Sequence, residues 1–376
     1  MKIGILTLPL HTNYGGILQA YALQTVLERM GHEVVIFNRY GAPTLPPFPK
    51  NLYYYSLRFI KKILGKPNII IRKEYVIRRE YPVVTKYPQR FIDQFLHCYW
   101  IDKICDIEKS EVDAIIVGSD QVWRPRYFAG MWHTSPSNSF LLFAKSFNIK
   151  RYAYAASFGV DEWEYSQNIA DELKFAAKKF DAISVREKTG VELCEKYLGV
   201  SADLVLDPTM LLNKEDYIKL INKCSQPSSQ GDMFCYILDS TIEKEELIDR
   251  ISRKKHLTPF YVKAEGLEKT SSIEERIHKP VEAWLRGFYD AKFVVTDSFH
   301  ACVFSILFEK PFIVIGNKGR GITRFSSLLE LFSLENHLID SVSDYNPDID
   351  YKIPETTRIL LEEWRKKSIS FLKEIR

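Results

Sequence analysis

Residues 294–316 read VVTDSFHACVFSILFEKPFIVIG, in which two short apolar runs flank a segment with helical spacing. The runs 294–295 and 312–315 are β-branched or aromatic, which is typical of buried strands. Between them, residues 301–308 place apolar side chains at helical intervals. The stretch therefore predicts a strand, a turn, a helix and a second strand, which is the repeating unit of a parallel α/β sheet.

His300 lies where the first predicted strand passes into the helix. In a parallel sheet this point is the carboxyl end of the strand, where open α/β sheets bind their ligands. Asp297 or Ser298 is placed to cap the helix, and the free N–H groups of its first turn favour an anion. The structural alternative is that His300 stands at the start of the helix and only forms a hydrogen bond with a neighbouring loop. Its position alone leaves both the functional and the structural interpretation open.

The same alternation of strands and helices continues along the chain. Strands are predicted at residues 2–8, 33–38, 112–117, 151–156, 182–185, 233–238 and 259–262, and helices at 18–30, 168–179, 243–255, 281–290 and 357–375. We therefore predict an α/β fold of two doubly wound Rossmann-like domains that face each other across a cleft. The predicted units are an N-terminal domain (1–206), a C-terminal domain (207–355) and a C-terminal helix (356–376) that packs back on the N-terminal domain.

Polar residues and glycines follow several predicted strands of the N-terminal domain. These candidate substrate-binding residues are Asn13, Gly15, Gly16, Gly118, Ser119, Gln121 and Arg186, with Asp120 as a candidate proton acceptor. Each has a structural alternative. The glycines suit a plain turn between a strand and a helix, Asp120 suits a cap, and Arg186 suits an ion pair with Glu187 or Asp181.

The length of 376 residues suggests two domains, and the formal net charge of +4 is small. The charge is unevenly distributed, however. Residues 50–90 contain eleven Lys or Arg and two Glu, an excess of nine positive charges, so the rest of the chain carries a net charge of −5. This asymmetry predicts one basic face and argues against a protein that coats nucleic acid.

The basic residues belong to an insertion at about 43–95, whose structure the sequence does not assign. Its stretch NLYYYSLRFIKKILGKPNIIIRKEYVIRREY (51–81) interleaves aromatic, aliphatic and basic residues. One interpretation is a solvated loop. The other, which we favour, is contact with the headgroup layer of a membrane or with the pyrophosphate of a lipid-linked saccharide. We therefore expect peripheral membrane contact through residues 50–90.

The cysteines form no C-x-x-C pair, and their spacing suits neither a zinc site nor a disulfide framework: Cys98, Cys105, Cys194, Cys224, Cys235 and Cys302. Reduced thiols, and hence a cytoplasmic location, are the simplest interpretation. The apolar run at the N-terminus is read as a strand, and no run approaches the roughly 18 apolar residues of a membrane span. We expect a cytoplasmic protein that acts at the inner face of the membrane.

Six blocks of sequence together resemble the polysaccharide pyruvyl transferase family: NYGGILQAYALQ (13–24), GSDQVW (118–123), DAISVRE (181–187), LDPT (206–209), VVTDSFHACVFSILFEKPF (294–312) and NKGRGITRFSSLL (317–329). The resemblance implies a two-domain fold of the glycosyltransferase B type. It also implies transfer of the enolpyruvyl carbons of phosphoenolpyruvate onto two hydroxyls of a sugar, which forms a cyclic ketal. Neither a metal nor a redox cofactor is expected.

The resemblance assigns roles to individual residues. The family's histidine, which acts as acid or base, corresponds to His300, and an arginine that holds the donor corresponds to Arg186. Where well-studied members carry a second donor-binding arginine, this sequence has Ser298. We expect Arg320 or Arg324 to supply the missing charge, because the phosphate and carboxylate of the donor require guanidinium groups.

The predicted function is a phosphoenolpyruvate-dependent transferase that acts on a cell-surface polysaccharide or lipid-linked oligosaccharide precursor. His300 would deliver a proton to the methylene carbon, with Asp297 or the donor as its neighbouring anion. The alternatives are a nucleotide-sugar-dependent glycosyltransferase of the same fold and a non-catalytic glycan-binding relative, since a fold does not determine a function.

Overall fold

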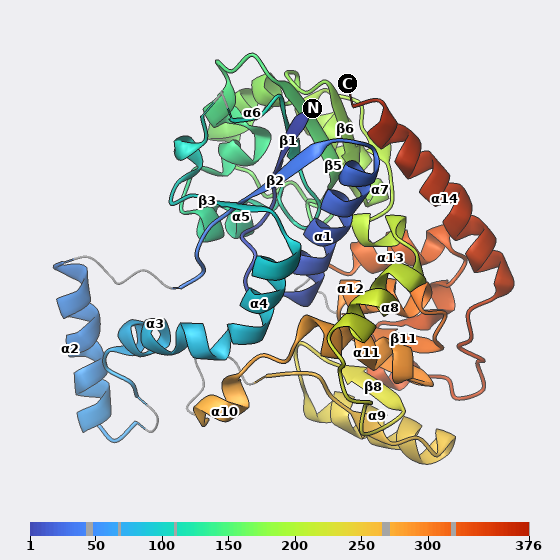
Figure 1. The fold of residues 1–376 in the computed structure, drawn as a ribbon. Coiled ribbons are helices and arrows are strands. Elements are labelled where there is room, and N and C mark those ends of the chain that lie inside the picture. Colours follow the sequence, from blue (N-terminus) through green and yellow to red (C-terminus); the bar gives the residue numbers. More distant parts are fainter. Residues whose placement is uncertain (43–47, 67–68, 109–110, 265–270, 317–320, 376) are drawn as a thin grey trace.

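A computed structural model describes residues 1–42, 48–66, 69–108, 111–264, 271–316 and 321–375. Two parallel sheets with helices on their faces make up the protein (Figure 1). This arrangement confirms the predicted α/β fold with two doubly wound units.

The first sheet has seven parallel strands in the order β3-β2-β1-β4-β5-β6-β7. Their bounds are Lys2–Leu6 (β1), Glu33–Asn38 (β2), Cys98–Trp100 (β3), Ala114–Val117 (β4), Lys150–Ala156 (β5), Ala182–Val185 (β6) and Asp203–Leu204 (β7). The helices in this half of the chain are Tyr14–Arg29 (α1), Lys50–Ile63 (α2), Lys73–Val84 (α3), Lys86–Phe95 (α4), Pro125–Trp132 (α5), Ala170–Ala177 (α6) and Lys188–Leu193 (α7).

The second sheet has five parallel strands in the order β12-β11-β10-β8-β9. Their bounds are Met233–Tyr236 (β8), Pro259–Phe260 (β9), Phe293–Thr296 (β10), Phe312–Ile315 (β11) and Leu338–Ile339 (β12). The helices are Lys214–Lys223 (α8), Ile242–Lys255 (α9), Ile273–Arg276 (α10), Val281–Asp290 (α11), Phe299–Leu307 (α12), Thr323–Leu331 (α13) and Glu355–Lys373 (α14). The opening stretch of sequence is thus β10, α12 and β11, as predicted.

Burial explains why these segments form strands and a central helix. All four residues of β4, of β10 and of β11 are buried, so these three strands are almost entirely apolar. Every residue of α12 is buried as well. Helix α1 is buried along most of its length and ends before Gly31, whose φ of +91° is the left-handed conformation that terminates helices. Strand β1 ends at Leu6, two residues earlier than predicted.

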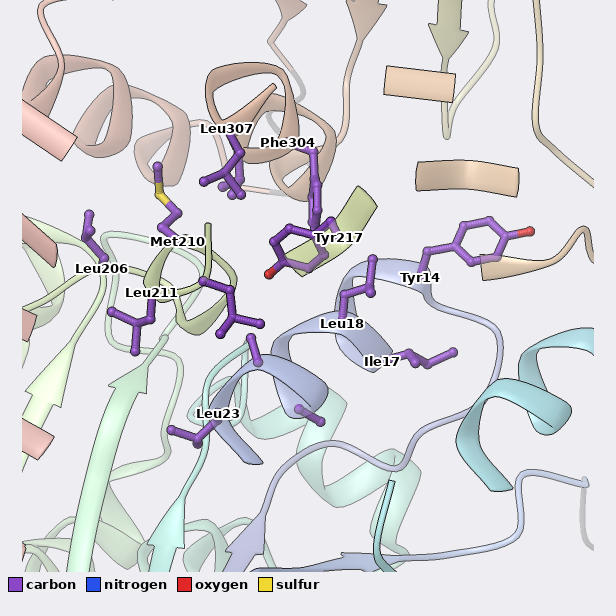
Figure 2. Close-up of a cluster of buried hydrophobic side chains, with 14 of the residues drawn as sticks. Tyr14, Ile17, Leu18, Leu23, Leu206, Met210, Leu211, Tyr217, Phe304 and Leu307 are labelled. Atoms are coloured by element: carbon purple, nitrogen blue, oxygen red, sulfur yellow. The ribbon is translucent and has the colours of Figure 1, made fainter. Parts of the chain in front are cut away.

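A single apolar core connects the two sheets. It packs α1 of the first unit against α12 of the second, with the 3-10 turn Pro208–Leu211 and α8 between them (Figure 2). Within it, the rings of Tyr217 and Phe304 lie 4.9 Å apart in an edge-to-face arrangement. Because this core is continuous, it fixes the beginning of α1 relative to the beginning of α12.

The insertion, which the sequence left unassigned, contains the three helices α2, α3 and α4 between β2 and β3. Phe91 and Ile92 of α4 are fully buried in the main core, whereas α2 has no buried residue. Figure 1 shows α2 at the periphery, connected to the body through α3.

Helix α14 returns to the first unit. The ring of Phe371 lies 6.0 Å from that of Tyr154 on β5, and the N–H of Leu206 donates to Ser368 Oγ at 2.9 Å. The side chain of Arg365 donates to the carbonyl of Met210 at 2.8 Å.

All six cysteines are free. Within the described residues, no helix combines the length and the apolar character needed to span a bilayer.

Candidate functional site

The carboxyl ends of the two sheets meet at a cavity of about 240 Å³. Residues from both units line it: Leu8, Asn13, Asp120, Gln121, Tyr127, Met131, Leu238, Asp297, Ser298, Phe299, His300 and Arg324. The first unit contributes segments that follow β1 and β4, and the second contributes segments that follow β8 and β10. Ligands of open α/β sheets bind at such strand ends, so this cavity is the candidate active site.

Arg186 follows β6 and forms the centre of a buried ion cluster behind the cavity. Its Nη1 donates to Asp207 Oδ2 at 2.6 Å, and its Nη2 donates to Asp120 Oδ1 at 3.3 Å. Its Nε lies 3.8 Å from Glu187 Oε2. Burial alone would lower the pKa of Arg186, but the three carboxylates raise it above its ordinary value. The sequence suggested Glu187 or Asp181 as an ion-pair partner of Arg186. Glu187 is such a partner, whereas Asp181 pairs with Lys150.

Asp207 was not among the predicted site residues, although it belongs to the LDPT block. It is buried, and its carboxylate accepts hydrogen bonds from Arg186, from Ser119 Oγ at 3.0 Å and from the N–H and Oγ1 of Thr209 at 3.1 and 2.7 Å. Burial alone would raise the pKa of Asp207, but His300, Arg186 and Thr209 hold it well below its ordinary value. Asp207 is therefore an anion that links Arg186 to the histidine.

His300 lies between Asp207 and the beginning of α1. Its Nε2 is 3.7 Å from Asp207 Oδ2, an ion-pair distance that is too long for a hydrogen bond. Among the described residues, the buried Nε2 has no hydrogen-bond partner. On its other side the imidazole packs on Gly15 so closely that a Cβ built there would overlap Nδ1 and Cγ. The anion beside His300 that the protein itself supplies is thus Asp207.

Asp297, which we expected as one of two candidates for that anion beside the donor, has other partners. Its carboxylate accepts from Lys244 Nζ at 2.7 Å and from the N–H groups of Leu238 and Asp239 at 2.6 and 3.1 Å. Of the two anions expected beside His300, Asp297 is instead bonded by Lys244 on α9 and by the turn after β8, and the donor stays a prediction. Asp297 instead ties the end of β10 to the end of β8.

Two guanidinium groups lie against the ring of Phe299. Arg186 lies 4.5 Å and Arg324 5.3 Å from the ring centroid, both within the range of cation–π attraction. Burial and the neighbouring Arg186 lower the pKa of Arg324 to about 10, so it remains charged at neutral pH. Arg324 lines the cavity, while Arg320 lies outside the described residues.

The N-termini of two helices open toward the cavity. Asn13 and Ser298 are the N-cap residues of α1 and α12, and neither side chain makes a capping hydrogen bond to the described backbone. Both line the cavity, and the contact of Gly15 with His300 holds the two helix starts together. The first N–H groups of a helix lack intrahelical acceptors and favour anions, so this geometry suits a negatively charged ligand.

Asp120 and Gln121 form the wall opposite α12. Asp120 has a φ of +69°, a left-handed conformation that is uncommon outside glycine and that aims its carboxylate at Arg186. Gln121 Oε1 accepts from Arg124 Nη1 at 3.1 Å, which orients this amide at the cavity. The arginine is in turn paired with Glu164.

The remaining predicted residues lie near the cavity without lining it. Gly118 packs on Ile5 and donates its N–H to the carbonyl of Leu6, and Ser119 is fully buried beneath Asp207. Gly16 lies beside Asn13 within α1.

Comparison with solved structures gives matches at low sequence identity. One is UGT89C1 from Arabidopsis thaliana complexed with UDP-L-rhamnose, at 11% identity and a TM-score of 0.47, covering 99% of this chain and 95% of that chain. Another is UDP-GlcNAc 2-epimerase from Neisseria meningitidis bound to UDP-GlcNAc, at 10% identity and a TM-score of 0.42, covering 97% of this chain and 100% of that chain. A third is the spinosyn forosaminyltransferase SpnP, at 10% identity and a TM-score of 0.41, covering 100% of this chain and 94% of that chain.

A search of curated protein sequences gave no match to this chain. The sequence profile of one family, described as polysaccharide pyruvyl transferase, matches residues 13–319. The matched region begins at the N-cap of α1 and includes both walls of the cavity as far as β11. Because the match covers most of its length, the chain belongs to the polysaccharide pyruvyl transferase family.

Proposed function

We propose that the protein transfers the enolpyruvyl group of phosphoenolpyruvate to two hydroxyls of a saccharide and forms a cyclic pyruvyl ketal. One observation carries this proposal. A single cavity brings together a buried guanidinium (Arg324), an imidazole (His300) and the N-termini of α1 and α12. The combination suits a compact anionic donor that must also receive a proton.

The donor needs positive charge for its phosphate and its carboxylate. Arg324 offers a guanidinium that can bind either group through two parallel hydrogen bonds. The backbone N–H groups after Asn13 and Ser298 offer further donors. Arg186 is surrounded by three carboxylates, so we assign it the role of holding Asp120, Asp207 and Phe299 in place behind the donor.

The reaction would proceed by addition followed by elimination. One acceptor hydroxyl adds to the central carbon of the enol while His300 delivers a proton to the methylene carbon. Asp120, which lines the cavity, accepts the hydroxyl proton. Phosphate would then leave with the proton held by Asp120, and the second hydroxyl would close the ketal as it gives its proton to His300, which restores both residues to their starting states. Because the chemistry is acid–base addition and elimination, it requires neither a metal nor a redox cofactor.

Asp207 would support the proton transfer. Its carboxylate lies 3.7 Å from His300 Nε2, so it would stabilise the imidazolium that forms when His300 takes up a proton. Arg186, Ser119 and Thr209 fix the position of this carboxylate. The arrangement resembles the role of an orienting carboxylate beside a catalytic histidine in other enzymes.

The test is an assay of phosphate release from phosphoenolpyruvate in the presence of panels of saccharide acceptors, with the ketal identified by mass spectrometry. Release that depends on the acceptor supports the proposal. A parallel assay offers nucleotide sugars and measures release of the nucleotide. Nucleotide release with no phosphate release would contradict the proposal and identify a glycosyltransferase.

A further inference from the structure

Helix α2 (Lys50–Ile63) turns its apolar side chains away from the protein. None of its residues is buried. Large apolar side chains on the helix and at its C-cap are 38% to 72% exposed: Leu52, Leu57, Phe59, Ile60, Ile63 and Leu64. A soluble protein ordinarily buries such a face, so an exposed one marks an interaction surface.

These six side chains lie on one face of the helix. At 100° per residue they span an arc of about 160°, which we name the apolar face of α2. Lys50 and Lys61 lie at one edge of this face, and Lys62 lies beyond the other edge. The helix is thus amphipathic, with basic residues on both sides of its apolar face.

The side of α2 opposite the apolar face is attached to the protein. Arg58 donates to Glu74 of α3 through Nη1 at 2.7 Å and Nη2 at 2.6 Å, and Nη1 also donates to the carbonyl of Ile71 at 3.2 Å. This bidentate pair holds the polar side of the helix inward, so the apolar face points outward. Figure 1 shows α2 away from both sheets.

Charge identifies the partner. Between residues 48 and 73 all seven charged side chains are Lys or Arg. In a symmetric pair of chains that met through α2, the lysines of both copies would lie beside one another and repel. An anionic surface that also accepts apolar side chains complements both the positive charge and the apolar face of the helix. We propose that α2 lies in the headgroup layer of an anionic phospholipid bilayer and anchors the protein there peripherally.

The proposal can be tested by sedimenting the protein with vesicles of phosphatidylcholine alone and with vesicles that also contain phosphatidylglycerol. We expect binding to the anionic vesicles, and weaker binding as salt increases because screening reduces the lysine contribution. Ile60→Glu places a charge on the apolar face and should lower binding at least about tenfold. Glutamate has good helix propensity, so the helix should persist.

Ile359→Glu is the matched control. Ile359 lies on α14 and is 59% exposed, close to the 51% of Ile60, so the substitution makes the same change of charge on another helix. The control should bind vesicles as the wild type does. A second variant, Lys61→Gln with Lys62→Gln, should lose preference for anionic vesicles while it keeps the apolar face.

Three results would overturn the proposal. These are no binding of the wild type to anionic vesicles, equal loss in the two Ile→Glu variants, and a dimer in light scattering that Ile60→Glu dissociates while vesicle binding is unchanged. Circular dichroism melts of each variant exclude unfolding as the cause. No donor or acceptor is present in these measurements, so their outcome is independent of the proposed pyruvyl transfer.

Discussion

The imidazole of His300 lies directly on the backbone of Gly15, although the two residues are 285 positions apart in the chain. Gly15 is the second residue of α1 in the first unit, and His300 is the second residue of α12 in the second unit. The contact leaves no room for a side chain at position 15. It therefore aligns the two helix N-termini and sets the orientation of the ring that we assign to proton transfer.

Gly15→Ala should impair turnover more than it impairs folding. The added methyl overlaps the ring at Nδ1 and must displace it, and a misplacement of about 1 Å can cost roughly 10²-fold in rate. Crowding of this kind typically destabilises by about 1–3 kcal/mol. The measurement is kcat for phosphate release together with a thermal melt.

Gly130→Ala provides the control for that variant. A Cβ at Gly130 meets nothing within 4 Å, and the residue lies within helix α5. We expect unchanged kcat and a slight gain in stability, because alanine favours a helix over glycine. If Gly15→Ala turns over as fast as Gly130→Ala, the close contact with His300 has no role in catalysis.

Arg186→Met should destabilise the protein strongly near pH 7. It leaves Asp120, Asp207 and Glu187 without their shared cation, and removing one partner of a buried ion pair typically costs about 3–5 kcal/mol. The measurement is the free energy of unfolding in denaturant. Arg253→Met, at an arginine whose side chain is 82% exposed, should change it by less than about 0.5 kcal/mol.

The contribution of Asp207 to the free energy of unfolding should change with pH in opposite directions in the wild type and in Arg186→Met. In the wild type the pKa of Asp207 is depressed, so its contribution to stability is present above its ordinary value of 3.8 and is lost as the pH falls through the lower folded-state pKa. In Arg186→Met that pKa would rise, because the buried carboxylate loses the guanidinium that, with His300 and Thr209, holds it low. The deficit of the variant should therefore shrink as the pH falls from about 7 to about 5. A deficit that stays constant over this range would contradict the buried cluster.

Much of this site follows from the sequence because strand ends are local features. The apolar run before Arg186 and the one before Asp297 identify one strand in each of the two sheets, and ligands of a parallel sheet bind at the carboxyl ends of its strands. The partners of these residues are different, because they depend on which strands are neighbours. Asp207 reaches Arg186 from the segment that follows the adjacent strand β7, and Lys244 reaches Asp297 from α9. Sequence spacing carries no signal for either pairing.

The insertion shows a second limit of sequence patterns. Helix α3 contains Pro82 in its interior, where proline ordinarily argues against a helix, and the many tyrosines of the insertion favour strands. Tertiary packing of Phe91 and Ile92 in the main core overrides these preferences for α4. The outward orientation of α2 depends on the Arg58–Glu74 pair, which no periodicity predicts.

Arg324→Gln should raise the KM for phosphoenolpyruvate at least about tenfold, since hydrogen bonds to charged groups contribute roughly 1.5–3 kcal/mol. Arg324 lines the cavity and is charged at neutral pH, whereas Ser298, which also lines it, carries no charge. Arg126→Gln, at an exposed arginine on α5, serves as the control and should leave KM unchanged. An unchanged KM in Arg324→Gln would show that Arg324 does not bind the donor. The double variant with Arg320→Gln would then test the second candidate.

His300→Asn should lower kcat by about 10²–10⁴-fold, which corresponds to roughly 3–5 kcal/mol of transition-state stabilisation, because it removes the general acid. Donor affinity should stay within a factor of about ten, since Arg324 and the two helix N-termini remain. Asparagine is also smaller than histidine, so Gly15 keeps its space. His256→Asn is the control, because His256 is exposed and its φ of +52° is a conformation that asparagine adopts readily. Turnover of His300→Asn at the rate of this control would reject the catalytic role. A lowered melting temperature together with lost activity would instead assign His300 to structure, because the imidazole then holds the two helix starts together without moving a proton.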